Sequence, residues 1–270
     1  MKTCICTLMK NGHEYLDEWL TYHFNLGIDM IYIYEDYTSK SHEDICIKYP
    51  NVRLESVSTM IESNGQTHSR QVQLWNSFML KYQNDFDWVA FIDLDEFIML
   101  EDGLNLKSFL SNYSDCTGLF MFWKIFKSDG RIDNPHTPLL ETYKTEFEPP
   151  IPARIKFPFK SFVNLNMCRH MICNHEVEYG VNVYKEHNCK DVIYDKIWLN
   201  HYFTRSWEEW SERFFKRGHI CTGNRQIDDF FLINPEMIGQ KQELMNFSFE
   251  KIKTNFKNMF SNGNRINNII

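Results

Sequence analysis

The chain has 270 residues, of which 43% are hydrophobic and 16% aromatic, and its formal net charge is -7. This length allows one large domain with a generous core, or one domain with a helical extension. A general nucleic-acid-binding protein needs a basic field, so the acidic balance argues against that class and predicts no nucleic-acid partner. A nucleotide ligand stays open, because it needs only a local site.

Targeting signals are not expected from the residue pattern. The chain begins with strand-like residues and lacks a basic region followed by a cleavable apolar segment. No window approaches the roughly 18 uninterrupted apolar residues of a membrane-spanning helix. The cysteines include no C-x-x-C pair, so a disulfide framework or a zinc site is the less favoured interpretation. Together these features predict a protein of the reducing cytosol.

The first hundred or so residues alternate between strand and helix patterns. Asn11 is expected to cap the first helix, with Glu14 three positions later, and Gly27 to end it. Strand, helix and strand at such short spacing argue for parallel pairing. We therefore predict an α/β fold with a mostly parallel, Rossmann-like sheet flanked by helices. The expected order is strand 3–9, the first helix, strand 30–34, strand 52–57, helix 69–82 and strand 88–92.

The stretch from Trp88 to Leu100 shows the strongest sign of chemistry. An apolar run typical of a buried strand is followed by Asp93, Asp95 and Glu96. Buried carboxylates are costly unless paired, and a divalent cation best tolerates a cluster of one sign. If the strand stays extended through this block, Asp93 and Asp95 point the same way. The pattern predicts a hard cation bridged to phosphate oxygens; the alternative is an acidic strand end that is solvated or paired with Lys or Arg.

Polar residues also follow other predicted strands, at Lys10-Asn11 and at Glu35-Asp36. Open α/β sheets bind ligands outside the carboxyl ends of their strands, so these residues are expected near a ligand. No G-x-G-x-x-G motif follows the first strand and the sequence contains no P-loop. The commonest dinucleotide and NTPase sites are therefore not expected.

Beyond residue 100 the pattern becomes less regular. A buried strand is expected at 118–123, and residues 134–160 form an irregular region rich in proline. Ser206 and Glu209 match a capping box that opens a helix expected to reach Arg217. A last helix is expected within residues 240–260.

Four blocks of sequence occur in an order typical of one family. They are Lys10-Asn11 with Glu14-Tyr-Leu-Asp-Glu-Trp-Leu-Thr-Tyr-His23, Tyr32-Ile-Tyr34, Phe91-Ile-Asp-Leu-Asp-Glu-Phe97, and His201-Tyr202 with Ser206 and Lys216-Arg-Gly218. Together, over residues 3–220, they resemble glycosyltransferases of the family 2-like and family 92 group. The chain departs from that pattern at Asn11-Gly-His-Glu14, where the family has adjacent Asn-Glu, and at Arg205, where many relatives carry Lys.

The resemblance implies a GT-A fold and a hexosyl-type glycosyltransferase with a DXD motif. The implied donor is a nucleotide sugar, with a UDP-sugar expected, and the implied cofactor is Mn²⁺ or Mg²⁺. Residues 1–240 would form the GT-A domain, of which 1–100 would bind the nucleotide sugar and 101–240 the acceptor. Residues 241–270 would form an amphipathic C-terminal helix or tail.

The resemblance also implies roles for single residues. Asp95 matches the metal-ligating acid, Asp93 an acid that contacts ribose or metal, and His201 a position that can complete the coordination of the metal. An inverting transfer also needs a general base, and Glu176 and Asp129 are candidates that have equally ordinary structural interpretations. The expected donor-binding residues are Lys10, Asn11, Glu35, Asp36, Arg70, Asp93 and Arg205.

The predicted reaction moves a sugar to a hydroxyl of a glycan or a lipid-linked glycan in surface polysaccharide synthesis, in the cytoplasm. One alternative is a haloacid-dehalogenase-like phosphatase, whose motif would carry Thr or Val where this chain has Phe97. Another is a glycan-binding protein without catalysis. The tail at 243–260 has an apolar face with lysines beside it, and it would either pack on the domain's own core or contact an anionic membrane surface.

Overall fold

The structure is a computed structural model that describes residues 1–36, 41–57, 70–148, 158–168, 170–177, 196–215 and 226–248. The chain divides into two compact units. The first, called the sheet unit here, contains Met1–Ile125, Pro138–Leu140 and Glu148–Tyr202. The second, called the helical unit, contains Phe126–Thr137, Glu141–Phe147 and Phe203–Ile270.

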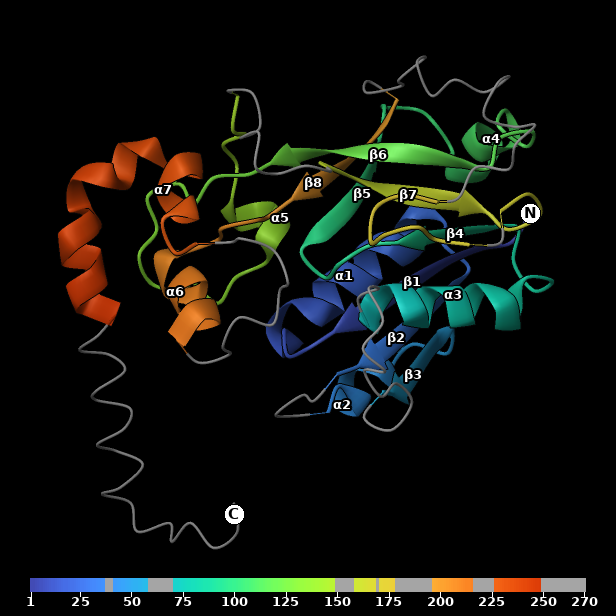
Figure 1. Cartoon of the computed structure of the whole chain (residues 1–270), viewed down its shortest axis with the longest axis horizontal. Helices are drawn as coiled ribbons and strands as arrows, with labels where there is room; N and C mark the ends of the chain where they lie inside the picture. The colour runs from blue at the N-terminus through green and yellow to red at the C-terminus, as the bar shows by residue number, and fades with distance from the viewer. Residues whose placement is uncertain are drawn as a thin grey trace, which may run out of the picture. The chain divides into compact units, whose positions relative to one another are not determined.

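An eight-stranded mixed sheet forms the centre of the sheet unit, in the order β3-β2-β1-β4-β7-β6-β8-β5 (Figure 1). The pairs β1–β2, β1–β4, β2–β3 and β6–β8 are parallel, and β4–β7, β5–β8 and β6–β7 are antiparallel. The predicted α/β, mostly parallel arrangement is confirmed and is consistent with a GT-A type. The strands are β1 Thr3–Met9, β2 Met30–Glu35, β3 Val52–Ser56, β4 Trp88–Phe91, β5 Glu96–Leu100, β6 Gly118–Ile125, β7 Phe159–Asn164 and β8 Ile197–His201.

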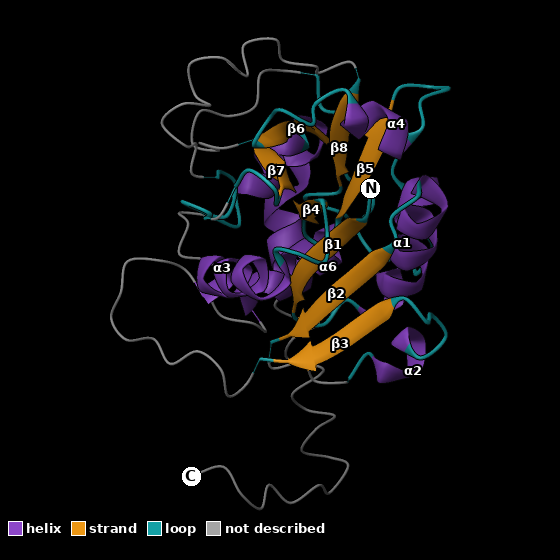
Figure 2. Ribbon diagram, turned by 90° about the vertical axis from the view of Figure 1, so that its right-hand side faces the viewer, coloured by secondary structure: helices purple, strands orange, loops and turns teal. Residues whose placement is uncertain are grey.

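Helices cover both faces of the β1–β3 part of the sheet, with α1 and α2 on one face and α3 on the other (Figure 2). Successive side chains of a strand point to opposite faces of the sheet, so each face needs its own cover. On one face, Cys4 and Cys6 of β1 pack in an apolar cluster with Trp75 and Phe78 of α3. Cys4 and Cys6 are both fully buried. The helices of this unit are α1 His13–Leu26, α2 Glu43–Cys46, α3 Arg70–Tyr82 and α4 Leu106–Ser111.

Helix α1 begins two residues later than its predicted cap. The capping position is Gly12, with φ 88°, and no side chain caps the helix, so the expectation that Asn11 caps it is wrong. Asn11 itself has φ 61°, which turns the chain out of β1 before the helix can start. Gly27 does end the helix, in the left-handed conformation that its sequence position predicted.

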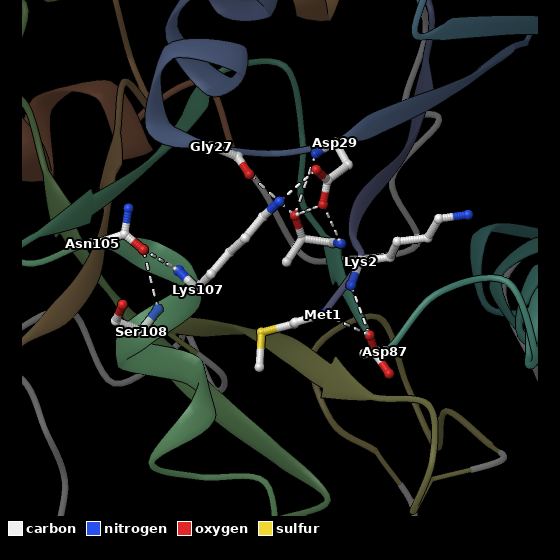
Figure 3. A network of polar contacts seen from close by, with 9 residues as sticks. Met1, Lys2, Gly27, Asp29, Asp87, Asn105, Lys107 and Ser108 are labelled. Carbon is white, nitrogen blue, oxygen red and sulfur yellow. Dashed lines mark hydrogen bonds and ion pairs between the residues drawn. The ribbon is translucent and has the colours of Figure 1, made fainter.

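A polar network ties the start of the chain to two other segments of the sheet unit (Figure 3). The carboxylate of Asp29 accepts hydrogen bonds from the backbone N–H and hydroxyl of Thr3 at 2.8 and 3.0 Å, and it pairs with Lys107 of α4. The backbone N–H of Lys2 donates to Asp87 at 2.7 Å, just ahead of β4. These contacts fix the entry of β1 between β2 and β4.

The helical unit is built around aromatic side chains of α6 Trp207–Phe215 and α7 Asp229–Ile233. The rings of Trp207 and Phe230 lie 5.0 Å apart and edge to face. Ser206 and Glu209 exchange backbone-to-side-chain hydrogen bonds of 3.3 Å, so the predicted capping box is confirmed. The unit also contains η1 Pro235–Gln240 and a helical stretch at 241–248, whereas α5 Leu139–Thr142 spans the boundary between the units.

The first part of the expected C-terminal helix packs inside the helical unit. The indole Nε1–H of Trp207 lies 2.9 Å from the carbonyl oxygen of Leu244 and 2.8 Å from the hydroxyl of Ser248. The rest of the tail on which the membrane-contact alternative depends, residues 249–260, lies outside the described residues. Within the described part of the chain, no helix is long and apolar enough to cross a membrane.

Candidate active site

The acidic block lies on a tight turn and not on a continuing strand. Strand β4 ends at Phe91, β5 begins at Glu96, and the backbone N–H of Glu96 donates to the carbonyl of Asp93 at 3.1 Å. The Glu96 carboxyl in turn accepts from the backbone N–H of Asp93 at 2.8 Å. The expectation of an extended chain through Leu94, with Asp93 and Asp95 alternating on one face, is therefore wrong. These two hydrogen bonds favour the turn.

The turn lies against the start of α1. A Cβ atom added to Gly12 would lie 2.4 Å from Cδ2 of Leu94, and the φ of Gly12 is already in the left-handed region. The left-handed φ favours glycine at this position, and a Cβ atom would also have to push the end of the Leu94 side chain aside. The loop after β1 and the acidic turn after β4 are thus held together at the carboxyl ends of two neighbouring parallel strands.

Asp93 is held by two side chains from separate elements. Its Oδ2 lies 2.8 Å from Nζ of Lys160 in β7, and its Oδ1 accepts from the amide of Gln71 in α3 at 3.1 Å. Lys160 is only 2% exposed, whereas the Asp93 side chain is 37% exposed. Burial alone would raise the pKa of Asp93, but the Lys160 ammonium holds that pKa below its usual value. Asp93 is therefore ionised and oriented while one part of it stays open to solvent.

Glu96 is fully buried directly beside this pair. Burial raises the pKa of its carboxyl well above the usual value, against the opposing effect of Lys160. A protonated Glu96 adds no negative charge to the turn.

Asp95 faces His201, the last residue of β8. The Oδ1 of Asp95 and Nε2 of His201 are 3.8 Å apart, and the His201 side chain is 4% exposed. The ring of Trp123 in β6 lies 4.4 Å from that imidazole. Register brings these residues together, because His201 pairs with Glu96 of β5 and with Ile125 of β6. The structure thus brings His201 to the acidic turn that carries Asp93 and Asp95, about 100 residues earlier in the sequence.

The donor-binding candidates after β2 are engaged with protein groups. Glu35 accepts from the backbone N–H of His42 at 2.7 Å and contacts its Nδ1 at 2.6 Å. Asp36 and Arg70 form an ion pair of 2.9 Å, and Arg70 also donates to the carbonyl of Val57. These acids orient α2 and the start of α3.

Lys10 and Asn11 lie on the loop between β1 and α1, next to Gly12 and therefore on the side of the sheet unit where the acidic turn lies. Glu176 also belongs to the sheet unit; its carbonyl accepts from the backbone N–H of Ile172 at 2.9 Å, and its side chain is partly buried.

Asp129 and Arg205 belong to the helical unit, and each has contacts there. Asp129 accepts from the backbone N–H of Lys144 at 2.7 Å, and Arg205 pairs with Glu209 at 3.1 Å. Both have positive φ, of 52° and 54°. These contacts give each of the two a structural role in its own unit, and the roles proposed from sequence stay predictions.

Two residues of the site were absent from the predicted set, Lys160 and Gln71. Lys160 is the charged residue among the buried positions of β7, and a buried lysine is a sign of a buried ion pair. Its partner could not be read from sequence, because the antiparallel pairing of β7 with β4 brings it to Asp93. Gln71 gave no comparable signal.

The pair Asp95 and His201 fits part of a metal site. Mg²⁺ typically uses one or two carboxylates, several waters and substrate phosphates, and Mn²⁺ also accepts imidazole. In the described residues, no group of three or more His, Cys, Asp or Glu side chains is arranged to hold a metal by itself. A cation here would therefore take its remaining ligands from the substrate and from water.

The fold and the site define a class of protein: an α/β protein with acidic side chains gathered at the carboxyl ends of its parallel strands. Comparison with known proteins names the family. The profile of glycosyltransferase family 92 matches residues 1–260, and the chain belongs to that family. This membership sets aside the haloacid-dehalogenase-like phosphatase.

Curated relatives agree with that assignment. A glycosyltransferase family 92 protein of Ricinus communis is 32% identical over 42% of this chain and 20% of its own length, and a longer alignment to the same protein is 23% identical over 83% and 39%. A family 92 protein of Oryza sativa is 27% identical over 41% of this chain and 18% of its own. The chain thus spans at most about two fifths of the length of these relatives.

Among solved structures, HddC from Yersinia pseudotuberculosis is similar to this chain at 9% identity and a TM-score of 0.33, over 70% of this chain and 87% of that one. A likeness of this size is too low to carry an argument about the site.

Proposed function

We propose that this chain is a metal-dependent glycosyltransferase that moves a sugar from a nucleotide-sugar donor, with UDP-sugars as the first choice, to a hydroxyl of a glycan or lipid-linked glycan. Surface polysaccharide synthesis in the cytoplasm is the proposed setting. The observation that supports the proposal most is the Asp95–His201 pair, 3.8 Å apart, beside the acidic turn of a family 92 chain.

Asp95 and His201 would hold Mn²⁺ or Mg²⁺ together with the donor diphosphate. The cation, when bound, offsets negative charge on the departing nucleoside diphosphate. His201 is packed against Trp123, so its ring is held in place before a ligand arrives.

Asp93 would contact the donor through its exposed part. Its carboxylate is 37% exposed and is oriented by Lys160 and Gln71, so a ribose hydroxyl can reach it and donate a hydrogen bond. Lys10 and Asn11 would line the nucleotide side of the same site, on the loop before α1. Asp36 and Arg70 would support that side through their ion pair.

For the general base we propose two candidate residues. A base must come within hydrogen-bond reach of the acceptor hydroxyl. Glu176, in the sheet unit with a partly buried side chain, is the first candidate to test, and Asp129 is the second. Arg205, in the helical unit, stays a predicted donor-binding residue.

The experiment measures release of nucleoside diphosphate from a panel of nucleotide sugars, with and without acceptor glycans. We expect activity with Mn²⁺ and its loss in EDTA. Asp95→Asn should lower kcat by about 100-fold, because a charge-stabilising ligand is worth several kcal/mol in the transition state. The matched control is Asp102→Asn, an exposed residue on the turn after β5, which should keep full activity.

Full activity of Asp95→Asn, or activity unchanged in EDTA, would overturn the metal role. Binding of glycans by a wild-type protein that releases no nucleoside diphosphate from any donor would favour the glycan-binding alternative.

A further inference from the structure

Strand β5 has backbone groups that point away from its neighbour β8. It is the last strand in the sheet order that the described residues form, and it pairs with β8. The carbonyl of Asp95 accepts from the backbone N–H of Tyr202, just beyond β8. Hydrogen-bonded and non-hydrogen-bonded pairs alternate along an antiparallel ladder, so Glu96 and Ile98 direct their N–H and C=O groups outward. Such groups on the edge of a sheet need other partners.

Three side chains of α1 supply these partners, and we call Trp19, Tyr22 and His23 the α1 edge residues. Helix α1 lies next to β5 (Figure 2). The indole Nε1–H of Trp19 donates to the carbonyl of Glu96 at 2.9 Å, and the hydroxyl of Tyr22 donates to the carbonyl of Ile98 at 2.8 Å. The backbone N–H of Ile98 donates to Nε2 of His23 at 3.3 Å. The α1 edge residues therefore bind β5 where a further strand would otherwise pair.

The hydrogen-bond partners of His23 fix its tautomer. Its Nδ1 lies 2.8 Å from the carbonyl oxygen of Trp19, which can only accept, so Nδ1 carries the proton. Its Nε2 then has the lone pair that accepts from Ile98. The side chain is fully buried, and burial lowers the pKa of His23 to about 3. His23 therefore serves as a neutral donor and acceptor that connects the backbone of α1 to the backbone of β5.

The bonds from α1 reach the acidic turn through Glu96, the first residue of β5. The backbone N–H of Glu96 donates to the carbonyl of Asp93, and its carboxyl accepts from the N–H of Asp93. The remaining backbone group of Glu96, its carbonyl, is the one that Trp19 binds. The start of α1 also lies against the turn, where Gly12 meets Leu94. Helix α1 therefore holds the turn at two separate points.

We propose that Trp19, Tyr22 and His23 are positioning residues, which hold β5 so that the acidic turn keeps its aspartates in the geometry that sugar transfer needs. This inference rests on the proposed function and adds α1 to the groups that shape the site. A displacement of about 1 Å at a reacting centre can lower a rate by about 100-fold. The inference also gives a role to the sequence block that ends at His23, which took part in the family resemblance without an assigned purpose.

The test compares His23→Phe, which keeps a ring and removes both nitrogens, with His23→Gln, whose amide oxygen can take the place of Nε2. Amide hydrogen exchange, followed by NMR without nucleotide, reports the opening of the turn at the N–H groups of Asp93 and Glu96. We expect exchange at both to be about tenfold faster in His23→Phe, because the buried N–H of Ile98 loses its acceptor. The kcat for nucleoside diphosphate release, per folded protein, should fall at least about tenfold. His23→Gln should restore both quantities to within about threefold of wild type.

Tyr22→Phe is the second variant, which decides the question if His23→Phe does not fold. It removes one hydroxyl from a partly buried side chain, and exchange at the turn should become about fivefold faster because one hydrogen bond to β5 is lost. The matched control is Tyr49→Phe. The hydroxyl of Tyr49 lies 2.8 Å from the Thr21 hydroxyl and 3.0 Å from Oδ1 of Asp17, both on the exposed side of α1. Its removal should leave exchange at the turn and kcat unchanged.

Exchange of the turn at the wild-type rate in the folded variants overturns the inference. A role in stability alone would speed exchange in strands that open with the whole domain, such as β1, and would leave the opening of the turn and kcat as they are. If exchange at the turn changes as expected, but no donor yields nucleoside diphosphate even with wild type, the proposed function is overturned and the hold of α1 on the turn stands. The two failures are therefore separate results.

Discussion

Glu96 shows how one residue of the acidic block serves the fold and not the chemistry. Its carboxyl is fully buried, accepts a hydrogen bond from the backbone N–H of Asp93, and has a pKa raised by burial. In the unfolded chain the same group ionises near its ordinary pKa of about 4.3. Between that value and the higher folded pKa, the folded state holds one proton more than the unfolded state. Stability from this residue therefore falls as the pH rises through that window.

Glu96→Gln is predicted to remove this dependence. The amide keeps an oxygen for the Asp93 N–H and has no proton to lose. In EDTA, wild type should lose about 1.4 kcal/mol of unfolding free energy, relative to the variant, for each pH unit between about 4.3 and the raised pKa of the folded state. Chemical denaturation at a series of pH values from 4 to 8 measures this difference. Glu101→Gln, which changes a partly exposed side chain, is the control. A constant difference between wild type and Glu96→Gln over that range would contradict the prediction.

Single residues of the site could be predicted from sequence where their type was unusual for their position. Asp93 and Asp95 stood out as charged residues at the end of an apolar run, and the family resemblance implied His201; the structure brings the three together. The Lys160 partner of Asp93 could not be predicted, because it comes from the pairing of β4 with a strand about 70 residues later. Alternation predicted the wrong side-chain geometry for Asp93 and Asp95, because the hydrogen bonds of the turn end the strand.

At the scale of elements, the contact between the acidic turn and the start of α1 is the feature that shapes the site. Gly12 combines φ 88° with a neighbour, Leu94, at 2.4 Å from the place of a Cβ atom. Any side chain at position 12 must therefore displace Leu94, which lies between Asp93 and Asp95. Sequence predicted the helix but neither the turn nor their contact, because the acidic block was expected to be extended and the glycine was taken as part of a cap centred on Asn11.

Gly12→Ala and Gly103→Ala test this contact as a pair. Both glycines have similar φ, 88° and 83°, but an added Cβ at Gly103 meets nothing within 4 Å. Gly103→Ala should cost about 1 to 2 kcal/mol from backbone strain alone, whereas Gly12→Ala should cost about 2 to 4 kcal/mol because overpacking is added. Urea unfolding measures both. Only Gly12→Ala should also lower the rate of nucleoside diphosphate release; equal costs and equal rates for the two variants would show that the turn does not depend on this packing.

The strands and helices themselves were largely predictable. Apolar runs and helical spacing located β1 to β4, α1 and α3, and the capping box located the start of α6. The order of the strands in the second half of the sheet was not predictable from sequence. Strands β5 to β8 form both parallel and antiparallel pairs, which local sequence patterns do not encode.

At the scale of the whole molecule, the residues that the structure brings together at the site all belong to the sheet unit. They come from the turn between β4 and β5 and from β5, β6, β7, β8 and α3. Membership of glycosyltransferase family 92 covers residues 1–260 and therefore both units. The central claim that follows is that Asp95 and His201 hold a divalent cation that in turn holds a nucleoside diphosphate.

Calorimetric titration with nucleoside diphosphates, in Mn²⁺ and in EDTA, tests that claim most directly. The account predicts that one diphosphate, with UDP as the first choice, binds only when Mn²⁺ is present. It predicts loss of that binding in Asp95→Asn and in His201→Gln, and its retention in Asp102→Asn. Binding of equal affinity in EDTA, or binding that survives Asp95→Asn unchanged, would contradict the account.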